Sequence, residues 1–196
     1  MATTKIQAAT QTAKRSFSAG SVISAIGRWI VRNRIYLIAF AIPAVLTYLA
    51  YALFGLYPFG EESVLCLDLN GQYVYYFEAL RDAFWGDGSI FYNWSRNLSG
   101  EFMGIIGYYL ASPFTLIVML LPEKFMLSSL LIMQLCKLGA AGATFNYFLQ
   151  KRRGVQPYPS LLFSTMYAMM AYGVIQLIDP MWLGRSGIPA ADHAGH

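Results

Sequence analysis

The chain has 196 residues, of which 57% are hydrophobic and only 12% are charged, with a formal net charge of +4. Average soluble domains carry about 25% charged residues, so this composition excludes an ordinary water-soluble fold. The positive charge does not indicate nucleic-acid binding, because cations and carboxylates are separated along the chain. Six cations precede the first acid, and seven of the ten acids lie between Glu61 and Glu101. This asymmetry is typical of a membrane protein with a cytoplasmic N-terminus.

The N-terminal region is predicted to be a tail followed by a membrane span. Residues 1–27 are rich in Ala, Ser, Thr and Gln with scattered cations, and we expect a disordered basic cytoplasmic tail. Residues 35–56 contain no charge. As a helix they would be about 33 Å long, enough to cross a hydrocarbon core of about 30 Å. Arginines precede this run and glutamates follow it, which places the tail inside and the next loop outside.

The external loop, residues 57–104, is predicted to carry an amphipathic helix over residues 71–85. Apolar side chains recur there at helical spacing, at Tyr73, Phe77, Leu80 and Phe84. We expect this helix to lie along the membrane surface with its aromatic residues at headgroup level. The sequence Gly-Asp-Gly at 86–88 ends it.

Two topologies are open for the apolar run at residues 105–121, which has Ser-Pro near its middle. It forms either a short span or an interfacial or re-entrant helix pair. The next run, residues 125–149, is long enough to cross and is followed by three cations at 151–153. The positive-inside rule favours the interfacial or re-entrant form, because those cations then face the cytoplasm. A third span is expected at residues 158–178.

The last thirteen residues, 184–196, differ abruptly from the apolar chain before them and contain both histidines. They are either a natural polar C-terminus or the product of a frameshift, since a shifted reading frame can encode a further apolar segment. With either reading, residues 28–183 are expected to be the membrane-embedded front portion of a longer protein. The predicted fold class is all-α: a polytopic transmembrane helical protein whose large external loop carries interfacial helices.

Several short motifs between residues 58 and 183 occur in a characteristic order. They are Pro58-Phe59-Gly60, Asp68-Leu69-Asn70-Gly71-Gln72-Tyr73, Leu98-Ser99-Gly100, Tyr108-Tyr109-Leu110-Ala111-Ser112-Pro113-Phe114, Lys137-Leu138-Gly139 and Met181-Trp182-Leu183. In this order and spacing the chain resembles the YfhO family of bacterial membrane proteins, which look like glycosyltransferases of the GT-C architecture. The resemblance implies a GT-C-like N-terminal portion in the bacterial cell membrane.

The resemblance also implies an activity: transfer of a sugar from a polyprenyl-phosphate carrier to an envelope glycopolymer outside the cell, such as teichoic acid. The partners are then this lipid-linked donor, the polymer acceptor and the bilayer, without nucleic acid. GT-C enzymes place an acidic residue in the first outer loop, and Asp68 occupies that position here. Asp68 would act as general base or as ligand of a divalent cation. The alternative is a structural carboxylate at the N-terminus of the helix that follows.

Three cations are candidates for binding the lipid phosphate. Lys137 lies in the middle of an apolar run, where a charge costs about 2.5–3.5 kcal/mol, so it should face the protein interior and pair with a phosphate or a carboxylate. Arg81 and Arg96 are the loop cations, and each would bind a phosphate or form a salt bridge with a nearby acid. Near Lys137, small residues at Gly139, Ala140, Gly142 and Ala143 predict a close helix contact.

Other functions are compatible with the same pattern. A transporter or permease component also has several spans and an intramembrane cation, and it would show broken helices and internal repeats. A non-catalytic truncated product is a further alternative, because three spans do not enclose a GT-C active site.

The cofactor stays open from the sequence. No metal-binding Cys/His pattern occurs, and a divalent cation bound by Asp68 is one alternative.

Overall fold

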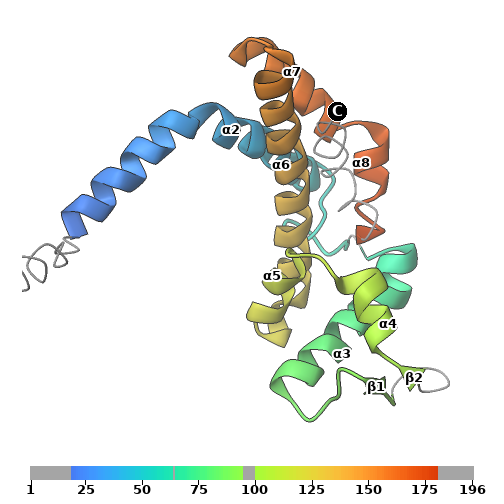
Figure 1. Cartoon of the computed structure of the whole chain (residues 1–196). Helices are drawn as coiled ribbons and strands as arrows, with labels where there is room; N and C mark the ends of the chain where they lie inside the picture. Colours follow the sequence, from blue (N-terminus) through green and yellow to red (C-terminus); the bar gives the residue numbers. More distant parts are fainter. Residues whose placement is uncertain (1–18, 64, 95–99, 181–196) are drawn as a thin grey trace, which may run out of the picture. The chain divides into compact units, whose positions relative to one another are not determined.

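The computed structural model describes residues 19–63, 65–94 and 100–180. This part of the chain is almost entirely helical (Figure 1), which confirms the all-α prediction. Its two short strands, β1 (Tyr92–Asn93) and β2 (Gly100–Glu101), pair in antiparallel orientation. The expected C-terminal tail at 184–196 lies outside the described residues. The chain divides into two units, Met1–Arg34 and Ile35–His196.

The first helix is α2 (Ala19–Leu53). It begins within the expected disordered tail, so that prediction is wrong for residues 19–27, while residues 1–18 lie outside the described part. Apolar residues recur at helical spacing from position 22 onward, and no proline occurs before Pro43. Scattered cations on one side of such a segment do not prevent a helix.

The helix α2 ends three residues before the expected end of the span, at a glycine turn. Gly55 has a φ of +64°, a conformation that glycine adopts without steric cost. The N–H of Leu56 then donates back to the Tyr51 carbonyl at 2.9 Å, which satisfies one of the free carbonyls of the last turn.

Two helical segments of the described chain are long and apolar enough to cross a membrane, Val22–Leu53 and Glu123–Arg153. The second contains the expected span at 125–149, and the first contains most of the one at 35–56. These lengths and compositions agree with the predicted membrane association.

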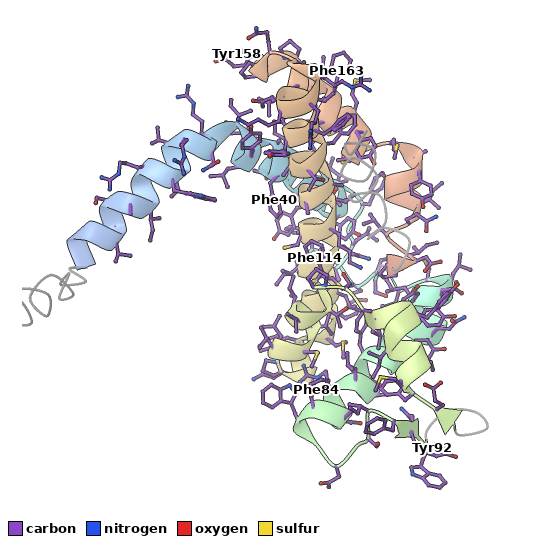
Figure 2. All side chains as sticks on the ribbon, viewed as in Figure 1. Phe40, Phe84, Tyr92, Phe114, Tyr158 and Phe163 are labelled. Carbon is purple, nitrogen blue, oxygen red and sulfur yellow. The ribbon has the colours of Figure 1, made fainter. Side chains whose placement is uncertain are left out.

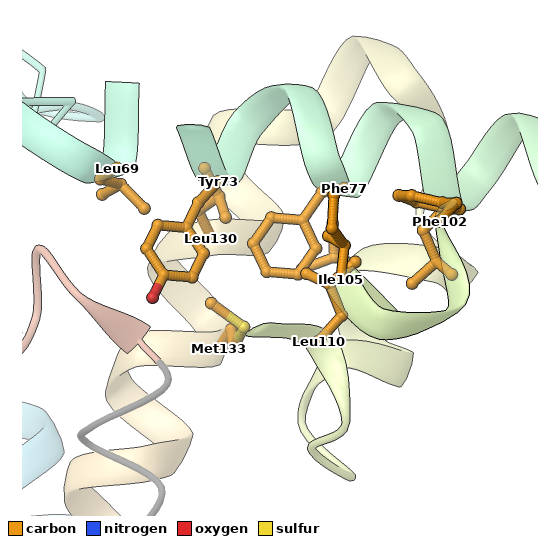
Figure 3. Packing of buried hydrophobic residues seen from close by; sticks show 10 residues of the cluster. Leu69, Tyr73, Phe77, Phe102, Ile105, Leu110, Leu130 and Met133 are labelled. Carbon is orange, nitrogen blue, oxygen red and sulfur yellow. The ribbon is translucent and has the colours of Figure 1, made fainter. Parts of the chain in front are cut away.

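The helix predicted in the external loop is present as η1 (Leu69–Tyr73) followed by α3 (Val74–Trp85), and it stops at Gly86. Most of its apolar face, however, packs against protein. Tyr73 is 1% exposed and Phe77 is 2% exposed, and both lie in a cluster with side chains from later helices (Figure 3). We call this cluster the loop core; its buried members are Leu69, Tyr73, Phe77, Leu80, Phe102, Ile105, Leu110, Val118, Leu130 and Met133. Protein therefore covers this face except at its end, where Phe84 is exposed, and the place of the helix at the membrane surface stays a prediction.

The run at 105–121 forms short helices rather than one span. The helices α4 (Met103–Ile105) and η2 (Ile106–Leu110) are continuous, and α5 (Thr115–Leu120) follows after a break at Ser112-Pro113. These two helical pieces are about 12 Å and 9 Å long, far short of the about 30 Å of a hydrocarbon core. The structure thus has the helix-pair form, and its place in the membrane stays a prediction.

The long helix α6 (Met126–Arg153) and α7 (Pro157–Ala168) form a hairpin. A short 3₁₀ turn, η3 (Glu123–Phe125), leads into α6. The hairpin is joined by stacked rings of Phe145 and Tyr167, whose centroids are 4.2 Å apart.

A buried polar cluster also joins α6 and α7. Asn146 donates to the hydroxyl of Ser160 at 3.0 Å and to that of Ser164 at 3.3 Å. Gln150 donates to the Asn146 side-chain oxygen at 2.6 Å. Asn146 and both serines have no exposed surface, so they form a closed hydrogen-bonded group.

The residues expected to form a third span make two helices. α7 ends at Ala168, and the five-residue helix α8 (Ala171–Ile175) follows after a break. A Cβ on Gly173 would lie 2.7 Å from the carbonyl oxygen of Ala168, so this close approach requires glycine. The interruption is a difference from the expected continuous helix, while the membrane crossing of residues 158–178 stays a prediction.

The small-residue face of α6 packs against α2, as expected. A Cβ on Gly139 would lie 2.8 Å from the carbonyl oxygen of Phe40, and one on Gly142 would lie 2.5 Å from that of Ala39. Phe40 is labelled at this contact in Figure 2. The backbones touch here because neither glycine has a side chain.

Candidate functional site

Asp68 lies directly before the π-helix η1, in the loop that follows α2. Its side chain is exposed and forms no capping hydrogen bond with the helix N-terminus. Gln72 donates to Asp68 Oδ1 over a long 3.5 Å. Leu67, immediately before it, has a φ of +47°, an unfavourable conformation for leucine that is typically found at functional sites. The carboxylate is therefore presented to its surroundings instead of capping the helix.

A second carboxylate, Asp179, is held by the loop core. Tyr73 donates its hydroxyl to Asp179 Oδ1. Figure 3 shows that this hydroxyl points out of the cluster that buries the rest of the ring. Tyr73 belongs to η1, so one side chain links the segment that begins at Asp68 to the segment after α8.

Lys137 is 4% exposed and donates to the carbonyl oxygen of Pro180 at 2.7 Å. Lys137 thus faces the protein interior, as its position in an apolar helix requires. Its partner is a backbone carbonyl, so phosphate binding and a structural ion pair both stay predictions.

Gln134, one turn before Lys137 on α6, makes a similar contact. It donates to the Leu177 carbonyl at 2.8 Å and accepts the Tyr51 hydroxyl at 3.1 Å. Two side chains of one helix face therefore hold residues 177–180, where α8 has ended and the backbone carbonyls lack helix partners.

Tyr109 of η2 lies beside two tyrosines of the helix that follows Asp68. Its ring centroid is 5.6 Å from that of Tyr73 and 5.2 Å from that of Tyr76. Burial raises the pKa of the Tyr109 hydroxyl, and the neighbouring tyrosines and the carboxylates of Asp179 and Asp68 raise it further. Tyr109 and Asp179 thus both contact Tyr73, and Asp68 begins the helical segment that carries Tyr73. We call Asp68, Tyr73, Tyr109, Lys137 and Asp179 the carboxylate–tyrosine site.

Arg81 is not part of this site. It donates to the carbonyl oxygens of Val118 at 2.8 Å, Met119 at 3.4 Å and Leu121. Trp85 donates to the same Met119 carbonyl at 3.0 Å. Arg81 thus caps the C-terminal end of α5, a role that neither sequence alternative included. Arg96 lies outside the described residues.

The described residues contain no group of three His, Cys, Asp or Glu side chains that could hold a metal ion. Binding of a divalent cation through Asp68 therefore stays a prediction.

Three members of the site were missed or underrated from the sequence. Tyr73 was predicted only as part of an apolar helix face, Tyr109 only as part of a motif, and no role was predicted for Asp179. The available signal was Lys137, since a cation in the middle of an apolar helix needs a polar partner inside the protein, and its partner is next to Asp179 in the chain.

One of three comparisons with known proteins finds a match. No curated protein and no solved structure matches the chain at a significant level. The family described as bacterial membrane protein YfhO matches residues 39–186, about three quarters of the chain. This match contains every motif on which the resemblance rested. The chain therefore belongs to the YfhO family of bacterial membrane proteins.

Proposed function

We propose that this chain is the N-terminal part of a multi-pass, GT-C-like glycosyltransferase with a cytoplasmic N-terminus. It would transfer a sugar from a polyprenyl-phosphate carrier to an envelope glycopolymer, such as teichoic acid, outside the cell. The observation that carries the proposal is the exposed Asp68, which does not cap a helix and lies in the loop between the two apolar helices. A lipid-linked substrate reaches its enzyme at such a membrane boundary.

In the proposed reaction an acceptor hydroxyl attacks the anomeric carbon of the sugar. The new bond joins that carbon to the acceptor oxygen, the bond to the carrier phosphate breaks, and polyprenyl phosphate leaves with the electron pair. Asp68 takes the hydroxyl proton as general base. The tyrosines around Tyr109 supply hydroxyl groups and ring faces for the sugar.

Lys137 would stabilise the departing phosphate only if residues 179–180 moved, since it donates to the Pro180 carbonyl. This contact supports a separate role, in which Lys137 holds Pro180 while Tyr73 holds the preceding Asp179. In that role Lys137 is a positioning residue.

The test uses the full-length gene of this family member in its native host, with envelope sugar content as the readout. Asp68→Asn should lower sugar transfer by about 100-fold or more, because a general base contributes a factor of about 10² to 10⁴. Asp87→Asn is the matched control, an exposed carboxylate in the same loop, and should change nothing. Lys137→Ala is tested in parallel. Unchanged glycosylation with Asp68→Asn at normal protein level would remove Asp68 from the mechanism.

Topology is tested by cysteine labelling of intact cells at positions 151–153. These residues end α6 and are exposed. The proposed arrangement, with a non-crossing helix pair at 105–121, leaves them unlabelled from outside. Labelling there would place the pair across the membrane.

A permease component is the second candidate, and the breaks between η2 and α5 and between α7 and α8 favour it. Broken helices at a polar site are typical of transporters. Purified full-length protein in detergent discriminates the two. A glycosyltransferase moves sugar from a lipid-linked donor to a soluble acceptor without a closed membrane, whereas a permease does not.

A further inference from the structure

The segment of α2 before the expected span, residues 19–34, has two different faces. Apolar side chains recur at helical spacing and are exposed: Val22, Ile23, Ile26, Trp29 and Ile30. A second line, spaced by four residues, holds Ser24, Arg28 and Arg32. Val31 on the polar side, Asn33 on the apolar side and Arg34 at the end depart from this pattern. Apolar and basic faces on one helix with a tryptophan are typical of helices that lie in a membrane surface.

We infer that residues 19–34 form a surface helix that binds anionic lipid headgroups of the leaflet facing the N-terminus. The 35 residues of α2 are about 52 Å long, whereas about 20 residues cross the hydrocarbon core. About 15 residues are therefore not needed for crossing. The chain also divides at Arg34 by its internal contacts, so this surplus is a separate unit.

A bilayer surface offers partners for both the apolar and the basic face of residues 19–34. Ile23 is 70% exposed and Ile26 is 52% exposed, and a surface helix buries such side chains about 5–10 Å into the headgroup boundary. Arg28 and Arg32 then meet the phosphates of anionic lipids.

The experiment uses the full chain in lipid vesicles, with Cys66 and Cys136 replaced by serine and a nitroxide label at a single new cysteine. The label is placed at Ile26→Cys on the apolar face or at Ser24→Cys on the polar face. Accessibility is measured with oxygen, which enters lipid, and with a water-soluble nickel complex. Vesicles contain phosphatidylcholine with or without phosphatidylglycerol.

With phosphatidylglycerol we expect lipid exposure at position 26 and water exposure at position 24. Each arginine near an anionic surface contributes about a fivefold factor, so Arg28→Gln with Arg32→Gln should shift the surface-bound equilibrium by about 25-fold. Omitting phosphatidylglycerol should act in the same direction. Arg152→Gln with Arg153→Gln, which removes equal charge at the exposed end of α6, should have no effect at position 26.

Three results would overturn the inference. Water exposure at both positions would show that the segment leaves the surface, and shielding of position 26 from both probes would show a protein partner or a second copy. If the label had the same accessibility with and without phosphatidylglycerol, the segment would not bind anionic headgroups. None of these results depends on sugar transfer.

Discussion

Replacing Gly142 by alanine tests the contact between α2 and α6. The new Cβ would lie 2.5 Å from the Ala39 carbonyl oxygen and 3.1 Å from Cγ of Pro43. Ordinary contact begins at 3.4 Å, so the backbones would have to separate by about 0.9 Å. Overpacking of this kind costs about 1–3 kcal/mol, and the higher helix preference of alanine offsets about 1 kcal/mol. We expect a net loss of up to about 2 kcal/mol of stability.

The assay is unfolding of the purified chain in mild detergent as the fraction of dodecyl sulfate is raised, followed by the helical circular dichroism signal. Gly142→Ala should unfold at a lower dodecyl sulfate fraction than the wild type. Gly27→Ala is the matched control in α2, because no atom lies within 4 Å of its new Cβ, and it should be as stable as the wild type or more so. If Gly142→Ala unfolds together with Gly27→Ala, the helices do not touch at this glycine.

Three further variants test the polar contacts with the same unfolding assay. Tyr73→Phe removes the hydrogen bond to the Asp179 carboxylate, and a loss of about 1.5–3 kcal/mol is expected; no loss would show that the contact is absent. Asn146→Leu removes the donor to two buried serines, and a loss of about 1 kcal/mol is expected; a gain would contradict the closed polar group. Burial, with two nearby carboxylates, raises the pKa of Glu78 above its unfolded value, so the folded state binds the proton more tightly and stability falls as pH rises from the ordinary carboxyl pKa through the raised one. Glu78→Gln should remove that fall and exceed the wild type at neutral pH, and an unchanged pH profile would exclude Glu78 as its source.

The long helices and their contact could be predicted because they depend on local composition. Apolar runs of spanning length indicate α2 and α6, the second with Lys137 as its one charge, and the small residues around Gly139 indicate where backbones approach. The start of α2 at Ala19 was missed, because a segment of mixed apolar and basic residues resembles a tail unless its helical spacing is tested.

Contacts between residues that are far apart in the sequence were harder to predict. The spacing of Tyr73 and Phe77 predicts an apolar helix face, but such a face can be buried by lipid or by protein. Arg81 was expected to meet an anion, whereas it caps the C-terminal end of α5, whose carbonyls lack helix partners because the helix ends at Leu120. These outcomes depend on which segments meet in three dimensions.

The closed polar group between α6 and α7 has a consequence for biogenesis. A lone asparagine leaving the translocon into hydrocarbon carries unsatisfied donors and acceptors, which are costly in lipid. Here the amide of Asn146 finds its partners on the very next helix, across a turn of three residues at 154–156. We therefore expect α6 and α7 to enter the bilayer together as a preassembled hairpin, with the basic end of α6 retained at the ribosome side.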